Sequence, residues 1–146
     1  YDHGMAAEKL NRLAEMEASF RKVIKLAPDN HQAYNALGYS FADRSLRLPE
    51  ALKLIEKAMQ MAPNDPYIMD SLGWVQFKLG KLKEAEATLR RAYQLRPDVE
   101  IATHLGEVLW QSGHKEAAEK IWREARSKEP DSETLKTTLT RLHVKL

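Results

Sequence analysis

The side chains that most often carry chemistry in proteins are spread thinly along this chain. No two of its five histidines stand four residues apart, the spacing that would place two metal ligands on one helical face. They are His3, His31, His104, His114 and His143. Cysteine is absent, so neither a disulfide framework nor a thiolate metal site can form. No glycine-rich loop follows a predicted strand. The sequence therefore predicts no metal, no cofactor and no enzyme active site.

Charged residues are numerous, but their arrangement is typical of a solvated surface. They make up 30% of the chain and nearly cancel to a net charge of +2, which gives no general attraction to nucleic acid or to an anionic membrane. Carboxylates such as Glu84 and Glu86 occupy water-facing helix positions, and the basic pair Arg90 and Arg91 lacks interleaved aromatic residues. We therefore expect no nucleic-acid partner. No apolar run reaches the roughly 18 residues that span a bilayer, so we also expect no direct membrane insertion.

The elements that would position a site are clearest in the stretch Leu72–Pro97. Two amphipathic helices of about a dozen residues meet there at Gly80, and Pro97 marks the end of the second. Gly73 lies in the middle of the first helix, where glycine costs about 1 kcal/mol relative to alanine. A neighbouring side chain is therefore expected to need that space.

The same hairpin pattern recurs along the chain. Prolines close it at positions 28, 63, 97 and 130, intervals of 35, 34 and 33 residues, which match the roughly 34-residue period of helical arrays. A Leu-Gly pair precedes each of the last three prolines, at 37–38, 72–73 and 105–106. The chain is therefore an internal repeat of helix pairs.

On these residues the chain resembles the tetratricopeptide repeat (TPR) family. The family signature of Leu-Gly, a small residue, an apolar or aromatic residue, Ala and Pro is present almost in full. Gln76 and Leu109 replace the usual aromatic residue, one residue is inserted near Arg47, and one is missing near Val99. The resemblance implies an all-α, right-handed superhelix of about four helix-turn-helix repeats, followed by a C-terminal capping helix.

The repeat period divides the single TPR domain, residues 1–146, into five parts. We expect a truncated first repeat over 1–28, full repeats over 29–63, 64–97 and 98–130, and the capping helix over 131–146. The chain begins without Met and four residues into the pattern, so we expect it to be a fragment. The first repeat has no covering helix, which leaves Met5 and Ala6 exposed or available for self-association.

The repeat geometry predicts where a partner binds. The first helices of successive hairpins line one concave surface, and residues three before, one after and four after each repeat glycine share a face. Aromatic rings there would anchor an extended or helical peptide, while polar groups would bind its backbone. The predicted peptide-binding groove consists of Asn35, Tyr39, Tyr67, Asp70, Trp74, Phe77, Thr103, Glu107 and Trp110.

An alternative for the three larger aromatic residues is packing between helices. Trp74, Phe77 and Trp110 could fill volume inside the stack instead of facing a partner. Trp122 differs, because it lies on a second helix at the position that Leu89 holds in the previous repeat. We assign Trp122 to the core.

One known class of TPR partner is disfavoured. The TPR domains that hold the acidic C-terminal tails of heat-shock chaperones resemble one another in a clamp of Lys, Asn and Arg. Here the equivalent positions hold Asn35, Tyr39, Asp70 and Ser71, so the cationic clamp is missing.

These observations predict a non-catalytic scaffold or adaptor that binds a protein segment in its groove. The runs NALGYSFADR, DSLGWVQFKLG and HLGEVLW are also similar to the C-terminal part of proteobacterial outer-membrane TPR lipoproteins. That similarity implies a role in envelope assembly or proteolysis, and a periplasmic, outer-membrane-associated location, with the cytoplasm as the alternative. A homo-oligomerisation module and the regulatory arm of a larger enzyme are the other two functions the sequence allows.

Overall fold

The computed structural model describes residues 4–5 and 12–146, and every regular element in these ranges is helical. Eight helices follow in order: α2 (Leu13–Leu26), α3 (His31–Asp43), α4 (Leu48–Met61), α5 (Pro66–Lys78), α6 (Leu82–Leu95), α7 (Val99–Gln111), α8 (Lys115–Lys128) and α9 (Glu133–Arg141). Within the described ranges, none of these helices has the length and apolar character needed to cross a membrane.

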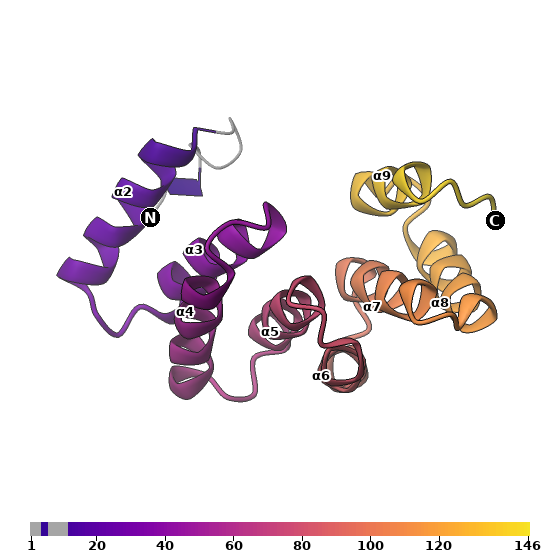
Figure 1. Cartoon of the computed structure of the whole chain (residues 1–146), viewed down its shortest axis with the longest axis horizontal. Coiled ribbons are helices and arrows are strands. Elements are labelled where there is room, and N and C mark those ends of the chain that lie inside the picture. Colours follow the sequence, from indigo (N-terminus) through magenta and orange to yellow (C-terminus); the bar gives the residue numbers. More distant parts are fainter. Residues whose placement is uncertain (1–3, 6–11) are drawn as a thin grey trace.

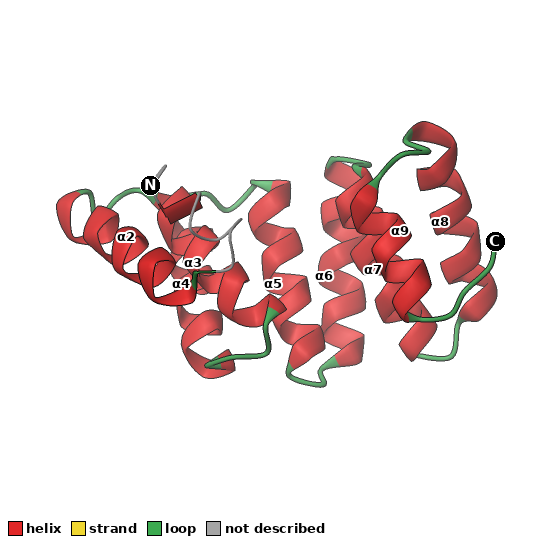
Figure 2. Ribbon diagram, turned by 90° about the horizontal axis from the view of Figure 1, so that it is seen from above, coloured by secondary structure: helices red, strands yellow, loops and turns green. Residues whose placement is uncertain are grey.

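The helices form a curved stack of antiparallel hairpins. Helices α3 and α4, α5 and α6, and α7 and α8 pack as pairs, and each pair also contacts the next one along the chain. Figure 1 shows α3, α5, α7 and α9 along the inner side of the arc and α4, α6 and α8 along its outer side. Figure 2 shows the pairs standing side by side. The predicted all-α solenoid is confirmed.

Polar caps and left-handed turns set the helix boundaries. The Asn30, Asp65, Asp98 and Ser132 side chains each accept a hydrogen bond from a backbone N–H in the first turn of the following helix. The hairpin turns at Gly80 and Gly113 have φ of +83° and +87°, which glycine adopts without steric cost.

The second hairpin turns differently because its connector is longer. Ser45 and Arg47 take positive φ values of 55° and 44° there, and Arg47 immediately precedes α4. This is the position at which the repeat pattern contains one extra residue. The inserted residue is accommodated by two non-glycine residues in the left-handed region, which is a strained conformation for L-amino acids.

Each repeat glycine makes room for a large side chain of the second helix. A Cβ atom at Gly38 would lie 2.7 Å from Ile55 Cγ1, and one at Gly73 would lie 2.5 Å from Leu89 Cγ. A Cβ at Gly106 would overlap the indole of Trp122. The prediction that a neighbour needs the space at Gly73 is confirmed, and so is the assignment of Trp122, which is fully buried, to the core.

The two ends of the stack differ. At the C-terminal end, α9 packs on α7 and buries Leu135 against the last hairpin. At the N-terminal end, Met5 is 44% exposed, as expected for the first repeat. Ala6 lies outside the described residues.

Candidate functional site

The concave surface formed by α3, α5, α7 and α9 contains two cavities. Cavity A, of about 330 Å³, lies at the N-terminal halves of the first helices. Cavity B, of about 570 Å³, lies at their C-terminal halves and extends to α9. Tyr39 lines both cavities, so they adjoin along one surface. The two cavities are lined by different polar side chains, and these side chains form hydrogen bonds and ion pairs with different residues of the chain.

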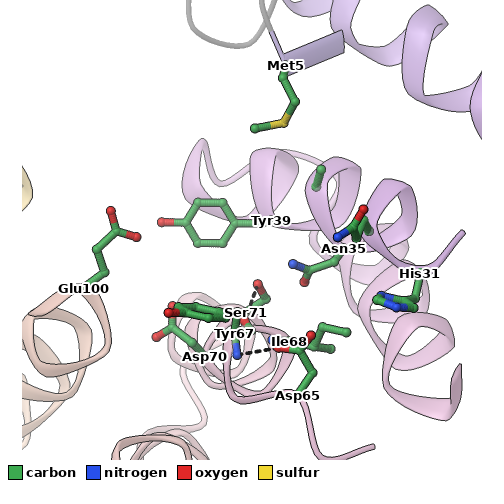
Figure 3. A pocket seen from close by; sticks show the side chains of 12 residues that line it. Met5, His31, Asn35, Tyr39, Asp65, Tyr67, Ile68, Asp70, Ser71 and Glu100 are labelled. Carbon is green, nitrogen blue, oxygen red and sulfur yellow. Dashed lines mark hydrogen bonds between the residues drawn. The ribbon is translucent and has the colours of Figure 1, made fainter. Parts of the chain in front are cut away.

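Cavity A is lined mostly by polar and tyrosine side chains. Asn35 and Tyr39 come from α3, Tyr67 and Asp70 from α5, and Glu100 from α7 (Figure 3). Five further described residues, with Met5 and Ser71, complete the lining: His31, Gln32, Ala36, Asp65 and Ile68. Three successive repeats therefore contribute to one cavity, because their first helices run parallel along the inner surface.

A hydrogen-bonded network separates the two cavities. His104 Nδ1 lies 2.8 Å and 3.0 Å from the two carboxylate oxygens of Asp70, and His104 Nε2 lies 3.3 Å from Tyr39 Oη. A carboxylate can only accept, so Nδ1–H donates to Asp70. The network joins α3, α5 and α7, and thereby connects three repeats through side chains that are far apart in the sequence.

The charges around His104 favour its protonated form. Burial is the largest single influence and lowers the pKa, since the residue is only 6% exposed. The charge and hydrogen bond of Asp70, with the charges of Asp43 and Glu100, act in the opposite direction and together outweigh it. The pKa of His104 is therefore raised above its ordinary value of 6.5.

Trp74 packs against this network and is almost fully buried. Its ring stacks on His104 at a centroid distance of 4.2 Å and on Phe77 at 5.0 Å. The indole Nε1–H donates to Asp43 Oδ1 at 3.1 Å. Only 3% of Trp74 is exposed, so one edge of it lines cavity B and most of the residue lies in the core.

Cavity B is closed at its far side by the capping helix. Arg141 of α9 donates two hydrogen bonds to the carboxylate of Glu107, at 3.0 Å and 2.5 Å. Glu107 is only 3% exposed, and the guanidinium of Arg141 neutralises its negative charge. The ammonium of Lys78 lies 5.2 Å from the centroid of the Trp74 ring. Several charged groups in cavity B are thus already paired.

The predicted groove residues separate into three groups in the structure. Asn35, Tyr39, Tyr67 and Asp70 come together in cavity A; Tyr39, Trp74 and Glu107 line cavity B; and Phe77, Thr103 and Trp110 line neither. Thr103 and Trp74 are buried, whereas Phe77 and Trp110 are partly exposed but lie outside both cavities. That these residues contact a peptide stays a prediction.

Packing between helices explains these departures. Residues 101–109 of α7 are all buried, because α5, α6, α8 and α9 surround this helix. Thr103 is fully buried and its hydroxyl donates to the Val99 carbonyl at 2.6 Å. Trp110 packs against Trp122, with ring centroids 5.8 Å apart. A capping helix that covers the end of the stack also covers the inner face of the last repeat.

His104, Glu100 and Arg141 are among the site residues that were not predicted from the sequence. His104 lies two positions before its repeat glycine, outside the offsets that define the groove. Glu100 lies in the first turn of α7, six positions before that glycine, and Arg141 lies on the capping helix α9. One signal was available for His104. It is a polar ring in an otherwise apolar helix, where burial would demand a hydrogen-bond partner.

Comparison with known sequences gives a consistent result. Two family profiles, both described as tetratricopeptide repeat, match residues 47–98 and 1–66. A TPR repeat-containing protein of Pseudomonas aeruginosa is 53% identical over 107 residues. The matched region is 73% of this chain and 18% of that protein, so the chain spans less than a fifth of the relative's length.

Solved structures share the same architecture. A thermophilic TPR protein of Thermus thermophilus superposes with a TM-score of 0.83 at 21% identity, over 97% of this chain and 78% of that one. An O-GlcNAc transferase mutant of Thermobaculum terrenum gives 0.79 at 22% identity, over 87% of this chain and 25% of that one. At such identities the likeness establishes the fold alone.

Proposed function

Because this chain belongs to the tetratricopeptide repeat family, whose members act as protein-interaction scaffolds, we propose that it is a non-catalytic adaptor that binds a protein segment along its concave surface. The supporting observation is that two adjoining cavities lie on this surface and share Tyr39. A chain segment that crosses Tyr39 would contact the first helices of three repeats.

The polar composition of the surface also supports this proposal. Peptide backbones need both donors and acceptors, and Asn35, Tyr39 and Thr137 offer them along the two cavities. The Asp70–His104 pair ends on the phenol of Tyr39 and is stacked on Trp74. In this proposal the Asp70–His104 pair has a structural role: it fixes the relative positions of the first helices and takes part in no reaction.

Site-directed photo-crosslinking in the full-length protein tests the binding surface. A benzophenone amino acid is placed at Tyr67 or at Thr137 on the concave side, and at Glu56, an exposed position on α4, as the matched control. We expect protein adducts from both concave positions and none from Glu56. Adducts from Glu56 alone would contradict the proposal.

The envelope role is the finer part of the proposal. The similarity of the Leu-Gly segments to outer-membrane TPR lipoproteins supports this role. In it, the adaptor would bind a protein that takes part in envelope assembly or proteolysis. Fractionation of cells that express the full-length gene tests the location. Recovery of the protein in the cytoplasmic fraction would exclude the envelope role and leave the adaptor proposal standing.

A second candidate is the regulatory arm of a larger enzyme. The favouring observation is the superposition of this chain on a quarter of the O-GlcNAc transferase chain. A third is self-association through the first repeat, where Leu26 is 74% exposed. Light scattering over a concentration series tests self-association, because a species that stays monomeric at every concentration would exclude it.

A further inference from the structure

Cavity A is rich in acceptor oxygens and poor in cations. Three carboxylates line it: Asp65 at the N-cap of α5, Asp70 within α5 and Glu100 in the first turn of α7 (Figure 3). None of its described lining residues is Lys or Arg. Asp70 is paired with His104, whereas Asp65 and Glu100 form no ion pair with any described residue, so the cavity keeps an excess of negative charge.

The three carboxylates differ in how much binding capacity they retain. Asp65 accepts hydrogen bonds from the backbone N–H groups of Tyr67 and Ile68, and Asp70 accepts from His104. Among the described residues, the Glu100 carboxylate has no ion-pair partner. Its pKa is raised, first by burial and then by the neighbouring charges of Asp98, Asp70 and Glu129, although His104 acts in the opposite direction. Glu100 is exposed to solvent and is thus the cavity-lining carboxylate that is accessible to an added cation.

The walls of cavity A provide further contacts for such a cation. Asn35 also lines the cavity, and its Oδ1 has no hydrogen-bond partner among the described residues. This oxygen is inaccessible to solvent, so a guanidinium reaches it only after the Asn35 side chain rotates toward the cavity. Tyr39 and Tyr67 place aromatic rings around the same space. Tyr67 already lies near one guanidinium, since Arg96 Cζ is 6.0 Å from its ring centroid. Tyrosine rings attract cations at such distances.

We propose that cavity A receives an arginine side chain of the protein segment bound along the concave surface, with Glu100 as its main ion-pair partner. This inference rests on the proposed function and adds the chemical class of the bound residue. Arginine fits better than lysine, because a planar guanidinium has five donors for acceptors on separate walls and can stack on a tyrosine ring. The charge preference is the reverse of that of a cationic clamp for acidic tails.

Short capped peptides test this inference on the purified chain. The probes are acetyl-Gly-Arg-Gly-amide and its citrulline analogue, which has nearly the same shape and no charge, and binding is followed by ¹⁵N chemical shifts at low salt. We expect saturable shifts at Tyr67, Asp70 and Glu100 with the arginine peptide, and affinity about fivefold to tenfold weaker with citrulline, as for loss of a charge-assisted hydrogen bond.

Two charge-neutralising variants complete the experiment. Glu100→Gln should weaken the arginine peptide about fivefold and leave the citrulline peptide unchanged, because only the ion pair is lost. Glu56→Gln, the matched control on the outer side, should change neither affinity. Equal affinity for the two peptides, or no saturable shift in cavity A up to about 10 mM peptide, would overturn the inference.

The outcomes of this test and of the crosslinking test are separable. If the concave positions crosslink to a partner but the arginine peptide binds no better than citrulline, the adaptor proposal stands and the arginine preference is wrong. If crosslinking occurs only from Glu56, the proposed function itself is wrong, and peptide binding in cavity A would then be unrelated to it.

Discussion

Cavities A and B lie at opposite ends of the same helices, but their charged side chains are paired within the chain to different extents. In cavity B, Glu107 is held by two hydrogen bonds from Arg141, and Asp43 accepts from Trp74. In cavity A, Glu100 is without a cationic partner in the described residues, and Asn35 retains an unpaired oxygen. B is therefore mainly a structural junction between the last repeat and its cap, whereas A contains the unpaired carboxylate on which the proposed arginine contact depends.

The largest test of this comparison is removal of the indole beside cavity B. Trp74→Ala should lower the free energy of unfolding by about 3 to 5 kcal/mol, because a nearly fully buried aromatic residue is lost. Tyr67→Ala in cavity A is the matched control and should cost less than about 1 kcal/mol, since Tyr67 is 43% exposed. Urea denaturation measures both. Equal costs would show that the two cavities do not differ in structural role.

Partner capture by a Trp74 variant must be interpreted in this light. Because Trp74 is buried, loss of binding in Trp74→Ala would report altered packing and would not identify a contact residue. Tyr39 and Tyr67 are the aromatic residues whose substitution tests contact with the partner.

The next largest effect concerns the cap. Arg141→Ala should cost about 1 to 2 kcal/mol, because it leaves the nearly buried Glu107 carboxylate without its bidentate partner. Lys136→Ala removes only the exposed 3.8 Å ion pair with Asp131 and should cost less than about 0.5 kcal/mol. Hydrogen exchange of α9 distinguishes the two variants, with faster exchange expected only for Arg141→Ala. Unchanged exchange would mean that other contacts hold the cap.

The network between the cavities should make stability depend on pH. The folded pKa of His104 is raised above 6.5, so the folded state binds the proton more tightly than the unfolded state. This stabilisation is complete below about pH 6.5 and is lost as the pH rises through the folded pKa. An NMR titration of the His104 ring should give a midpoint above 6.5 in the native protein.

The corresponding control removes the carboxylate. In Asp70→Asn the burial of the ring is no longer outweighed by its partner, so the His104 midpoint should fall below that of the native protein. The part of the pH dependence that arises from His104 should decrease with it. An unchanged midpoint would show that Asp43 and Glu100, not Asp70, control the titration.

The smallest expected effect is at cavity A. In Glu100→Gln, loss of a favourable charge at a helix N-terminus opposes relief of repulsion from Asp98 and Asp70, so stability should change by less than about 0.5 kcal/mol. Urea denaturation checks this. A loss as large as that of Arg141→Ala would mean that Glu100 is a structural residue, and the contrast between the cavities would disappear.

Much of the architecture could be read from the residues alone, because it depends on local and repeated chemistry. Gly80 and Gly113 mark the turns, Asn30 and Asp65 cap helices, and Gly73 implies a large neighbour, which is Leu89. Each of these relations involves one hairpin or less, and the repeat period presents the pattern several times. Four of the predicted groove residues also meet in cavity A.

Only the tertiary structure decided which residues of the concave surface are exposed to solvent and which are buried or paired. His104 meets Asp70 across 34 positions and Tyr39 across 65, and Glu107 meets Arg141 across 34. Such pairings depend on superhelical curvature and on the placement of α9, which no single repeat encodes. The sequence determined the helices and the face they share, because propensity and periodicity act locally. The difference between a paired and an unpaired carboxylate on that face arose from contacts between repeats.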